Sequence, residues 1–170
     1  YDYIRSCDRE YRSYIKKVAN SIAADDTNKI VMLSGPSGSG KTTTAHFVEK
    51  YINDLGKKAI TVSLDNFYLG RDKVPKLPDG RNDFESINAL NIEEMKKCLN
   101  GLIKNGHCDM PEFDFNEGKP KKEKISLELP KDGIAIFEGI HALNSMILDE
   151  LPRQNIFKIY VSVQDGIYDG

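Results

Sequence analysis

One stretch of eight residues constrains this chain more than any other feature. Residues 35–42 read GPSGSGKT and match the pattern GxxxxGK[ST] at every fixed position. An apolar run over 30–34, typical of a buried strand, precedes them, and a helical pattern follows. A strand, a glycine-rich turn and a helix in this order form a phosphate-binding loop, so the sequence predicts a nucleotide-binding α/β domain.

The residues of this loop have distinct predicted roles toward phosphate. Glycines let the backbone turn tightly, so that successive N–H groups point at phosphate oxygens beside the positive end of a helix. Lys41 is predicted to reach the β- and γ-phosphates, and the Thr42 hydroxyl to bind Mg²⁺. We therefore expect ATP and Mg²⁺ as cofactors, while backbone contacts leave ATP or GTP open as the donor. The expected nucleotide-binding set is Gly35, Ser37, Gly38, Ser39, Gly40, Lys41, Thr42 and Thr43.

The rest of the chain alternates between strand and helix patterns. This alternation predicts a P-loop NTPase three-layer fold of α/β class with a mainly parallel central sheet. Residues 106–131 contain short strand-like pieces and are expected to form a small hairpin-bearing excursion. The expected strands cover 30–34, 59–64, 134–137 and 156–163. The expected helices cover 8–24, a segment after the glycine-rich turn that stops at Gly56, and a segment that begins after Asn91 and stops before Gly106.

Composition and charge exclude several other classes of protein. A net charge of −2 over 170 residues gives no general attraction to nucleic acid or to an anionic membrane, so neither is expected as a partner. The longest apolar runs, such as 134–137, are too short to span a bilayer. Three cysteines without a CxxC spacing favour reduced thiols and a cytoplasmic protein. The oligomeric state, including a homo-oligomer, stays open.

Two acidic residues stand at the ends of predicted strands. Asp65 ends VSLD, and Glu138 ends IFE. Parallel sheets place their ligands at the carboxyl ends of their strands. Phosphoryl transfer to an alcohol needs Mg²⁺ and a carboxylate that aligns or deprotonates the hydroxyl. A GTPase is disfavoured, because neither DxxG nor NKxD occurs in the chain.

Four segments in order resemble the uridine kinase and phosphoribulokinase-like P-loop kinases. They are GPSGSGKTT, SLDNFY, PEFDF and FEGIHALN, with a looser fifth segment FESINAL, and the resemblance covers about residues 29–163. It implies transfer of the ATP γ-phosphate to a small-molecule hydroxyl, first of all the 5′-hydroxyl of a nucleoside. Lys41 and Asp65 would then be catalytic, and Thr42, Asp65 and Glu138 would hold Mg²⁺.

The resemblance also implies an acceptor site. Asp65 would align the attacking hydroxyl, with Tyr68 from the same segment beside the acceptor. Glu85 stands where the family has an aspartate that binds the ribose hydroxyls, and Phe113 takes the position of an aromatic residue near the base. His141, an aliphatic position in many relatives, is expected to have a structural or helix-start role.

The chain departs from the family pattern at two places. Uridine–cytidine kinases read the pyrimidine with a histidine shortly after the PEFDF-like segment, whereas residues 116–118 here are Asn-Glu-Gly. The family's arginine-rich lid follows the last strand, whereas only residues 164–170 follow here, without arginine. A missing C-terminal lid is therefore expected, and the preferred base stays open.

The domain organisation follows from these observations. Because the chain opens with Tyr1, residues 1–28 are expected to form a helix that leads from an upstream region. Residues 29–170 are expected to form a P-loop kinase domain that is truncated at its C-terminus.

Two other functions remain open at this point. One is a kinase for a different metabolite, such as ribulose 5-phosphate or pantothenate, for which Arg71, Lys73 and Arg81 could supply positive charge. The other is a regulatory module that binds ATP and phosphorylates nothing, which the missing lid and the absent histidine favour.

Overall fold

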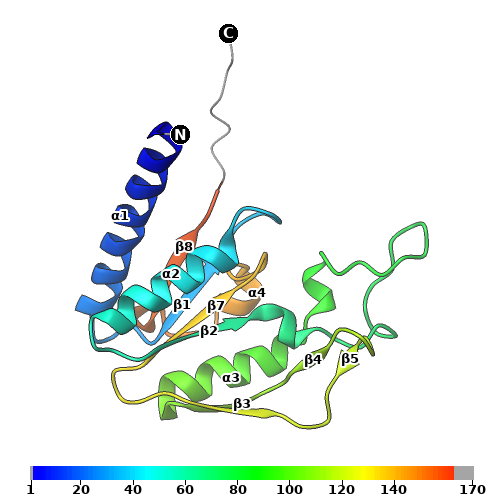
Figure 1. Cartoon of the computed structure of the whole chain (residues 1–170). Coiled ribbons are helices and arrows are strands. Elements are labelled where there is room, and N and C mark those ends of the chain that lie inside the picture. Colours follow the sequence, from blue (N-terminus) through cyan, green and yellow to red (C-terminus); the bar gives the residue numbers. More distant parts are fainter. Residues whose placement is uncertain (1, 163–170) are drawn as a thin grey trace.

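Four parallel strands form the centre of the molecule, seen in a computed structural model that describes residues 2–162 (Figure 1). The strand order is β2 (Ala59–Ser63), β7 (Ile134–Glu138), β1 (Ile30–Ser34) and β8 (Ile156–Tyr160). Every residue of β1 and β7 is buried, as expected for strands covered on both faces. The predicted α/β class and parallel sheet are therefore confirmed. The strand expected over 156–163 ends at Tyr160, and its last residue lies outside the described range.

Helices cover both faces of this sheet, which gives three layers (Figure 1). α1 (Asp2–Ala24) and α2 (Lys41–Asp54) pack against one face, with Val31, Leu33, Ile134 and Ile136 of the sheet in their shared core. The alternate residues of the same strands point to the other face, where α3 (Ile92–Asn105) and α4 (Ser145–Leu148) lie. The first of these two core clusters is called the α1/α2 core below, and the second the α3/α4 core.

α3 begins and ends at residues that the sequence singles out. The Asn91 side chain accepts a hydrogen bond from the Glu94 backbone N–H at 3.2 Å, which satisfies a free donor of the first turn. Gly106 ends the helix in the left-handed conformation at φ 70°. Both ends agree with the helix expected between Asn91 and Gly106.

The expected excursion between α3 and β7 consists of two small antiparallel sheets. β3 (His107–Met110) pairs with β6 (Ile125–Glu128), and β4 (Phe113–Asp114) pairs with β5 (Lys119–Pro120). These sheets and residues 64–92 contain the predicted acceptor residues Asp65, Tyr68, Glu85 and Phe113, and are called the acceptor lobe below. Residues 2–162 also include three short 3₁₀ helices: η1 (Leu64–Phe67), η2 (Ile87–Ala89) and η3 (Arg153–Asn155).

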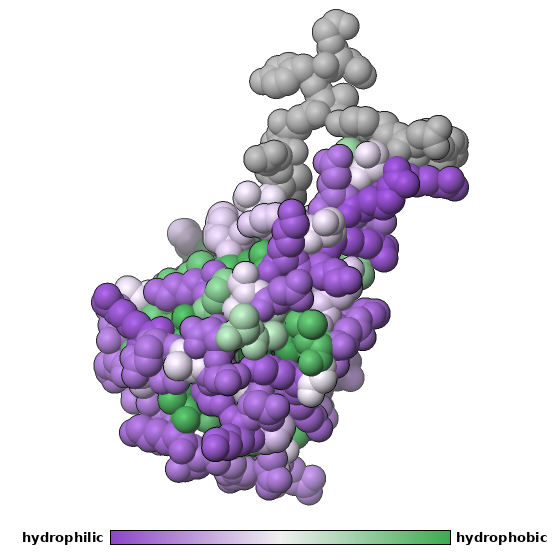
Figure 2. Space-filling model, turned by 90° about the vertical axis from the view of Figure 1, so that its left-hand side faces the viewer, coloured by the Kyte–Doolittle hydropathy of each residue, from purple (hydrophilic) through white to green (hydrophobic). Residues whose placement is uncertain are grey.

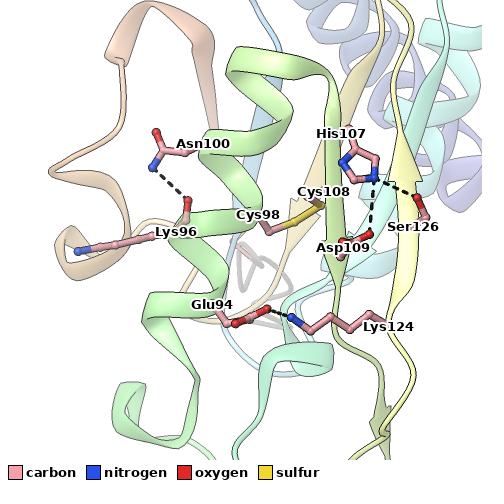
Figure 3. Close-up of a disulfide and its surroundings, with 9 residues drawn as sticks. All are labelled: Glu94, Lys96, Cys98, Asn100, His107, Cys108, Asp109, Lys124 and Ser126. Carbon is pink, nitrogen blue, oxygen red and sulfur yellow. Dashed lines mark hydrogen bonds and ion pairs between the residues drawn. A yellow bond between two sulfur atoms is a disulfide. The ribbon is translucent and has the colours of Figure 1, made fainter.

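A disulfide joins Cys98 of α3 to Cys108 of β3 (Figure 3). The expectation that all cysteines are reduced is therefore wrong for this pair, whereas Cys7 is free and exposed. The two cysteines are buried and meet because β3 packs against α3, with their Cα atoms 5.0 Å apart. Sequence spacing alone carries no sign of such tertiary proximity.

α1 belongs to the core rather than standing apart from it. Ile15, Ala19 and Ile22 are 5%, 0% and 0% exposed and contribute to the α1/α2 core. The division of the chain after residue 28 stays a prediction, as does the upstream region. Within residues 2–162, no helix combines the length and the apolar character that a membrane span requires. The face in Figure 2 is mostly hydrophilic, with apolar residues in small separate patches.

Candidate active site

The phosphate-binding loop connects β1 to α2 at the carboxyl edge of the sheet. Gly38 and Gly40 have φ of 74° and 83°, the left-handed region that residues with a side chain adopt with strain. A Cβ atom at Gly35 would lie 2.3 Å from the Val161 carbonyl oxygen, so this position has no room for a side chain. The glycines of the motif are therefore required by the local backbone.

The polar side chains of the loop are arranged around an open cradle. Lys41 Nζ donates a hydrogen bond to the Pro36 carbonyl at 2.7 Å, which folds the lysine back over the loop. Ser39 Oγ is buried and has no hydrogen-bond partner within the described residues. A buried hydroxyl without a partner is costly, and a bound phosphate oxygen would supply one.

A cavity of about 360 Å³ lies beside this loop and joins most of the predicted site residues. It brings Lys41 and Thr42 into the same space as Asp65, Glu138, Tyr68 and Glu85. Of the other predicted residues, Ser37 and Gly38 also line it, whereas Gly35, Ser39, Gly40, Thr43 and Phe113 do not. The complete lining is Ser37, Gly38, Lys41, Thr42, Ser63, Asp65, Tyr68, Phe84, Glu85, Glu138, Gly139 and Ile140.

Asp65 lies in η1, directly after β2. The Ser63 hydroxyl accepts a hydrogen bond from the Asp65 backbone N–H at 3.3 Å. Burial raises the pKa of the Asp65 carboxyl, and the neighbouring Tyr68 hydroxyl and Lys41 act in the opposite direction. Burial and the Asp65 carboxylate together raise the pKa of Tyr68. The Tyr68 hydroxyl therefore stays protonated and donates to the Phe84 carbonyl at 3.1 Å. A carboxylate in this environment is a stronger base than an exposed aspartate.

Glu138 ends β7 in register with Leu33 of β1 and Ser63 of β2. It is 7% exposed, lines the cavity, and within residues 2–162 its carboxylate has no hydrogen bond or ion pair. Its oxygens are therefore free to bind a cation in the cavity.

Three oxygen donors thus share the cavity, from Thr42, Asp65 and Glu138. This donor set fits Mg²⁺, which prefers oxygen ligands. In the described part of the chain, no three acidic, histidine or cysteine side chains come close enough to hold a metal by themselves. Mg²⁺ at nucleotide sites is held by one or two carboxylates together with phosphate oxygens, so this arrangement suits a metal that arrives with its nucleotide.

His141, in the loop that follows β7, contacts the segment that contains Glu85. His141 Nε2 lies 2.7 Å from the Glu85 carbonyl oxygen, and Asp83 Oδ1 accepts hydrogen bonds from the backbone N–H groups of Glu85 and Ser86, each at 3.1 Å. A structural role was expected for His141, but the sequence did not reveal this partner, 56 residues away.

A second cavity of about 250 Å³ contains Phe113 and has mainly aromatic walls. Tyr68 packs edge-on against Phe84 and Phe113, with ring centroids 5.2 and 5.8 Å apart, and Phe113 packs against Phe115 at 5.1 Å. Tyr68 and Phe84 line both cavities, so the two cavities adjoin one another. Sequence reasoning did not name Phe84 and Phe115 as site residues, although both lie in quoted segments, FESINAL and PEFDF.

Basic residues are distributed unevenly around this second cavity. Arg71 lines it, whereas Lys73 and Arg81 line neither cavity. Arg81 pairs with Asp79 at 2.7 Å instead.

Comparison with known proteins agrees with this geometry. A family model described as "Phosphoribulokinase / Uridine kinase family" matches residues 30–167. A uridine kinase of Lactobacillus helveticus is 30% identical over 138 residues, which cover 81% of this chain and 63% of the relative. A uridine kinase of Saccharomyces cerevisiae is 31% identical over 137 residues, 79% of this chain and 26% of the relative. The chain thus spans less than two thirds of these relatives.

A solved structure gives the same fold. A protein described as "a Possible Uridine Kinase from Bacillus stearothermophilus" superposes with a TM-score of 0.72 at 18% identity. The superposition covers 92% of this chain and 83% of that protein.

Proposed function

The chain belongs to the phosphoribulokinase/uridine kinase family, and from this membership we propose that it transfers the γ-phosphate of ATP to the 5′-hydroxyl of a nucleoside. The observation that carries the proposal is the shared cavity. The loop residues Lys41 and Thr42 line the same space as the acidic residues Asp65 and Glu138, and an aromatic pocket adjoins that space. A phosphate donor and a hydroxyl acceptor can therefore meet there.

The phosphate loop supplies the donor side. Backbone N–H groups over 37–42 would hold the phosphate oxygens, and Lys41 Nζ would exchange its bond to the Pro36 carbonyl for the β- and γ-phosphates. Thr42, Asp65 and Glu138 would hold Mg²⁺, which neutralises charge on the phosphates when it is bound. The partial positive charge at the start of α2 adds to this stabilisation.

The transfer step uses Asp65 as the base. Its carboxylate accepts the proton of the acceptor hydroxyl as the hydroxyl oxygen bonds to the γ-phosphorus, and the bond from that phosphorus to the β-phosphate oxygen breaks, releasing ADP. The Tyr68 hydroxyl lies beside Asp65 and opposes the rise in the pKa of that carboxyl that burial causes. Glu85 would bind the sugar hydroxyls, and Phe113 would pack near the base.

The distribution of basic residues argues against a sugar phosphate as the acceptor. Of the three candidates, Arg71, Lys73 and Arg81, only Arg71 lines the acceptor pocket. A phosphate group on the acceptor would therefore find a single cation there.

The test is acceptor-dependent release of ADP from Mg-ATP, with Lys41→Ala as the blank. The acceptors are uridine, cytidine, the purine nucleosides, ribulose 5-phosphate and pantothenate. We expect stimulation by a nucleoside. Stimulation by a non-nucleoside alone would replace the acceptor and keep the chemistry. ATP binding without stimulation by any acceptor would indicate a regulatory module.

A further inference from the structure

The aromatic pocket of the acceptor lobe has one cationic side chain. Four of its lining residues, Tyr68, Phe84, Phe113 and Phe115, contribute rings, and the fifth is Arg71. The Tyr68 hydroxyl donates to the Phe84 carbonyl, so it is already engaged. Rings around a cavity of about 250 Å³ favour a flat, apolar-faced ligand, whose polar edge must be read by Arg71.

Arg71 is fixed at the pocket by its neighbours. Its backbone N–H donates to the Gly118 carbonyl at 2.9 Å, and Nη2 donates to the Phe115 carbonyl at 3.1 Å. In the described part of the chain, no carboxylate forms an ion pair with its guanidinium. Because a guanidinium carries five N–H donors, several remain for a ligand.

Because Gly118 has no side chain, the Arg71 guanidinium can occupy the space beside it. A Cβ atom at Gly118 would lie 2.1 Å from Arg71 Nε and 2.6 Å from Cζ. No rotation of the added methyl group could relieve this overlap, so any larger residue would displace the arginine side chain. A substitution at position 118 would therefore act through the position of the Arg71 side chain.

The chemistry of the guanidinium sets a preference between ring edges. It donates hydrogen bonds and accepts none, so it binds a ring carbonyl and leaves an exocyclic amino group unpaired. Resting on the function proposed above, we propose that Arg71 selects acceptors whose ring presents a carbonyl over those that present an amino group. Uridine and cytidine are suitable probes, because the group on ring carbon 4 is a carbonyl in uridine and an amino group in cytidine.

The first test compares kcat/KM for uridine and for cytidine. We expect the wild-type chain to prefer uridine about 5- to 10-fold, because the guanidinium pairs with a carbonyl, whereas it leaves an amino group to the water that reaches exposed Arg71 and Phe115. Arg71→Gln places an amide there, which both donates and accepts. Activity with uridine should fall several-fold, and the preference should nearly disappear, while the affinity for Mg-ATP stays unchanged. Arg153→Gln removes the same charge from an exposed position on η3 and should alter neither ratio.

The second test moves the guanidinium without removing it. Gly118→Ala should reduce the preference for uridine, because its Cβ displaces Arg71. Gly56→Ala is the matched control: Gly56 also has a positive φ, of 86°, but a Cβ there meets nothing within 4 Å. Both variants carry the same kind of backbone strain, so thermal unfolding separates a loss of stability from a change in specificity.

Three outcomes would count against this assignment. If the wild-type chain phosphorylates nucleosides and Arg71→Gln keeps its uridine-to-cytidine ratio, the role of Arg71 is wrong and the kinase function stands. A wild-type preference for cytidine would also overturn it. If the wild-type chain phosphorylates no nucleoside, the proposed function fails and this inference fails with it.

Discussion

The burial of Asp65 has two opposite consequences. Its burial beside the phosphate loop raises the pKa of the carboxyl, which makes it a better proton acceptor and also makes its ionised form costly in the folded chain. The direction of this pKa shift sets how the stability of the folded chain depends on pH. A group whose folded pKa lies above the ordinary 3.8 favours folding at low pH, and this contribution is lost as the pH rises through the folded pKa.

We therefore expect Asp65→Asn to affect activity and stability in opposite directions. Phosphate transfer should fall by about 10²- to 10⁴-fold with nearly unchanged affinity for ATP, because the base is lost and an oxygen ligand remains. In metal-free buffer at pH 7 the variant should melt at a higher temperature than the wild-type chain, because no charge is buried. This difference should disappear as the pH falls below 3.8, where Asp65 is protonated in both states.

Melting curves between pH 3 and pH 8 with a chelator, together with single-turnover rates at pH 7, would measure both effects. Full transfer activity in Asp65→Asn would overturn the assignment of the base. A variant that is less stable than the wild-type chain at pH 7 would show that the carboxylate is compensated in the folded protein.

At the scale of elements, the site depends on contacts that join separate segments. The segment that carries Glu85 belongs to the acceptor lobe, whereas His141 follows β7 of the central sheet. The hydrogen bond between His141 Nε2 and the Glu85 backbone carbonyl joins the acceptor lobe to the loop after β7. We therefore expect His141 to act as a positioning residue for Glu85.

Loss of this hydrogen bond should weaken binding of the acceptor and leave binding of the nucleotide unchanged. We expect His141→Ala to raise KM for the acceptor several-fold, with the Kd for Mg-ATP unchanged, because the donor loop makes no use of the histidine. His141→Gln keeps a donor and should recover much of the loss. His107→Ala, an exposed histidine on β3, is the control and should leave both constants as they are. A parallel weakening of ATP binding in His141→Ala would contradict this role.

α1 contributes to stability through its buried face. Ile22 is fully buried in the α1/α2 core, whereas Tyr14 on the same helix is 65% exposed. Ile22→Ala should therefore reduce the free energy of unfolding by about 2–4 kcal/mol. Tyr14→Ala should change it by less than about 0.5 kcal/mol. Chemical denaturation of the two variants would test this, and similar values for both would mean that α1 is not part of the cooperative unit.

At the scale of the whole molecule, features encoded by local sequence patterns were predicted, whereas contacts between distant segments were not. The loop after β1, the cap of α3 at Asn91 and the strand-end acids Asp65 and Glu138 are all encoded within a few residues, so sequence reasoning located them. The contacts of Arg71 with Phe115 and of His141 with Glu85 span 44 and 56 residues, and no local pattern reveals them. The pairing of Cys98 with Cys108 depends in the same way on how β3 packs against α3.

The two core clusters on opposite faces of the sheet separate the two halves of the site. The α1/α2 core supports the helix that follows the phosphate loop, and the α3/α4 core includes Phe67 and Met110, which belong to the acceptor lobe. We therefore expect substitutions within the acceptor lobe to repack mainly the α3/α4 core, on the face of the sheet opposite α1 and α2. Such a division would let the acceptor pocket change shape with little effect on the helix that follows the phosphate loop.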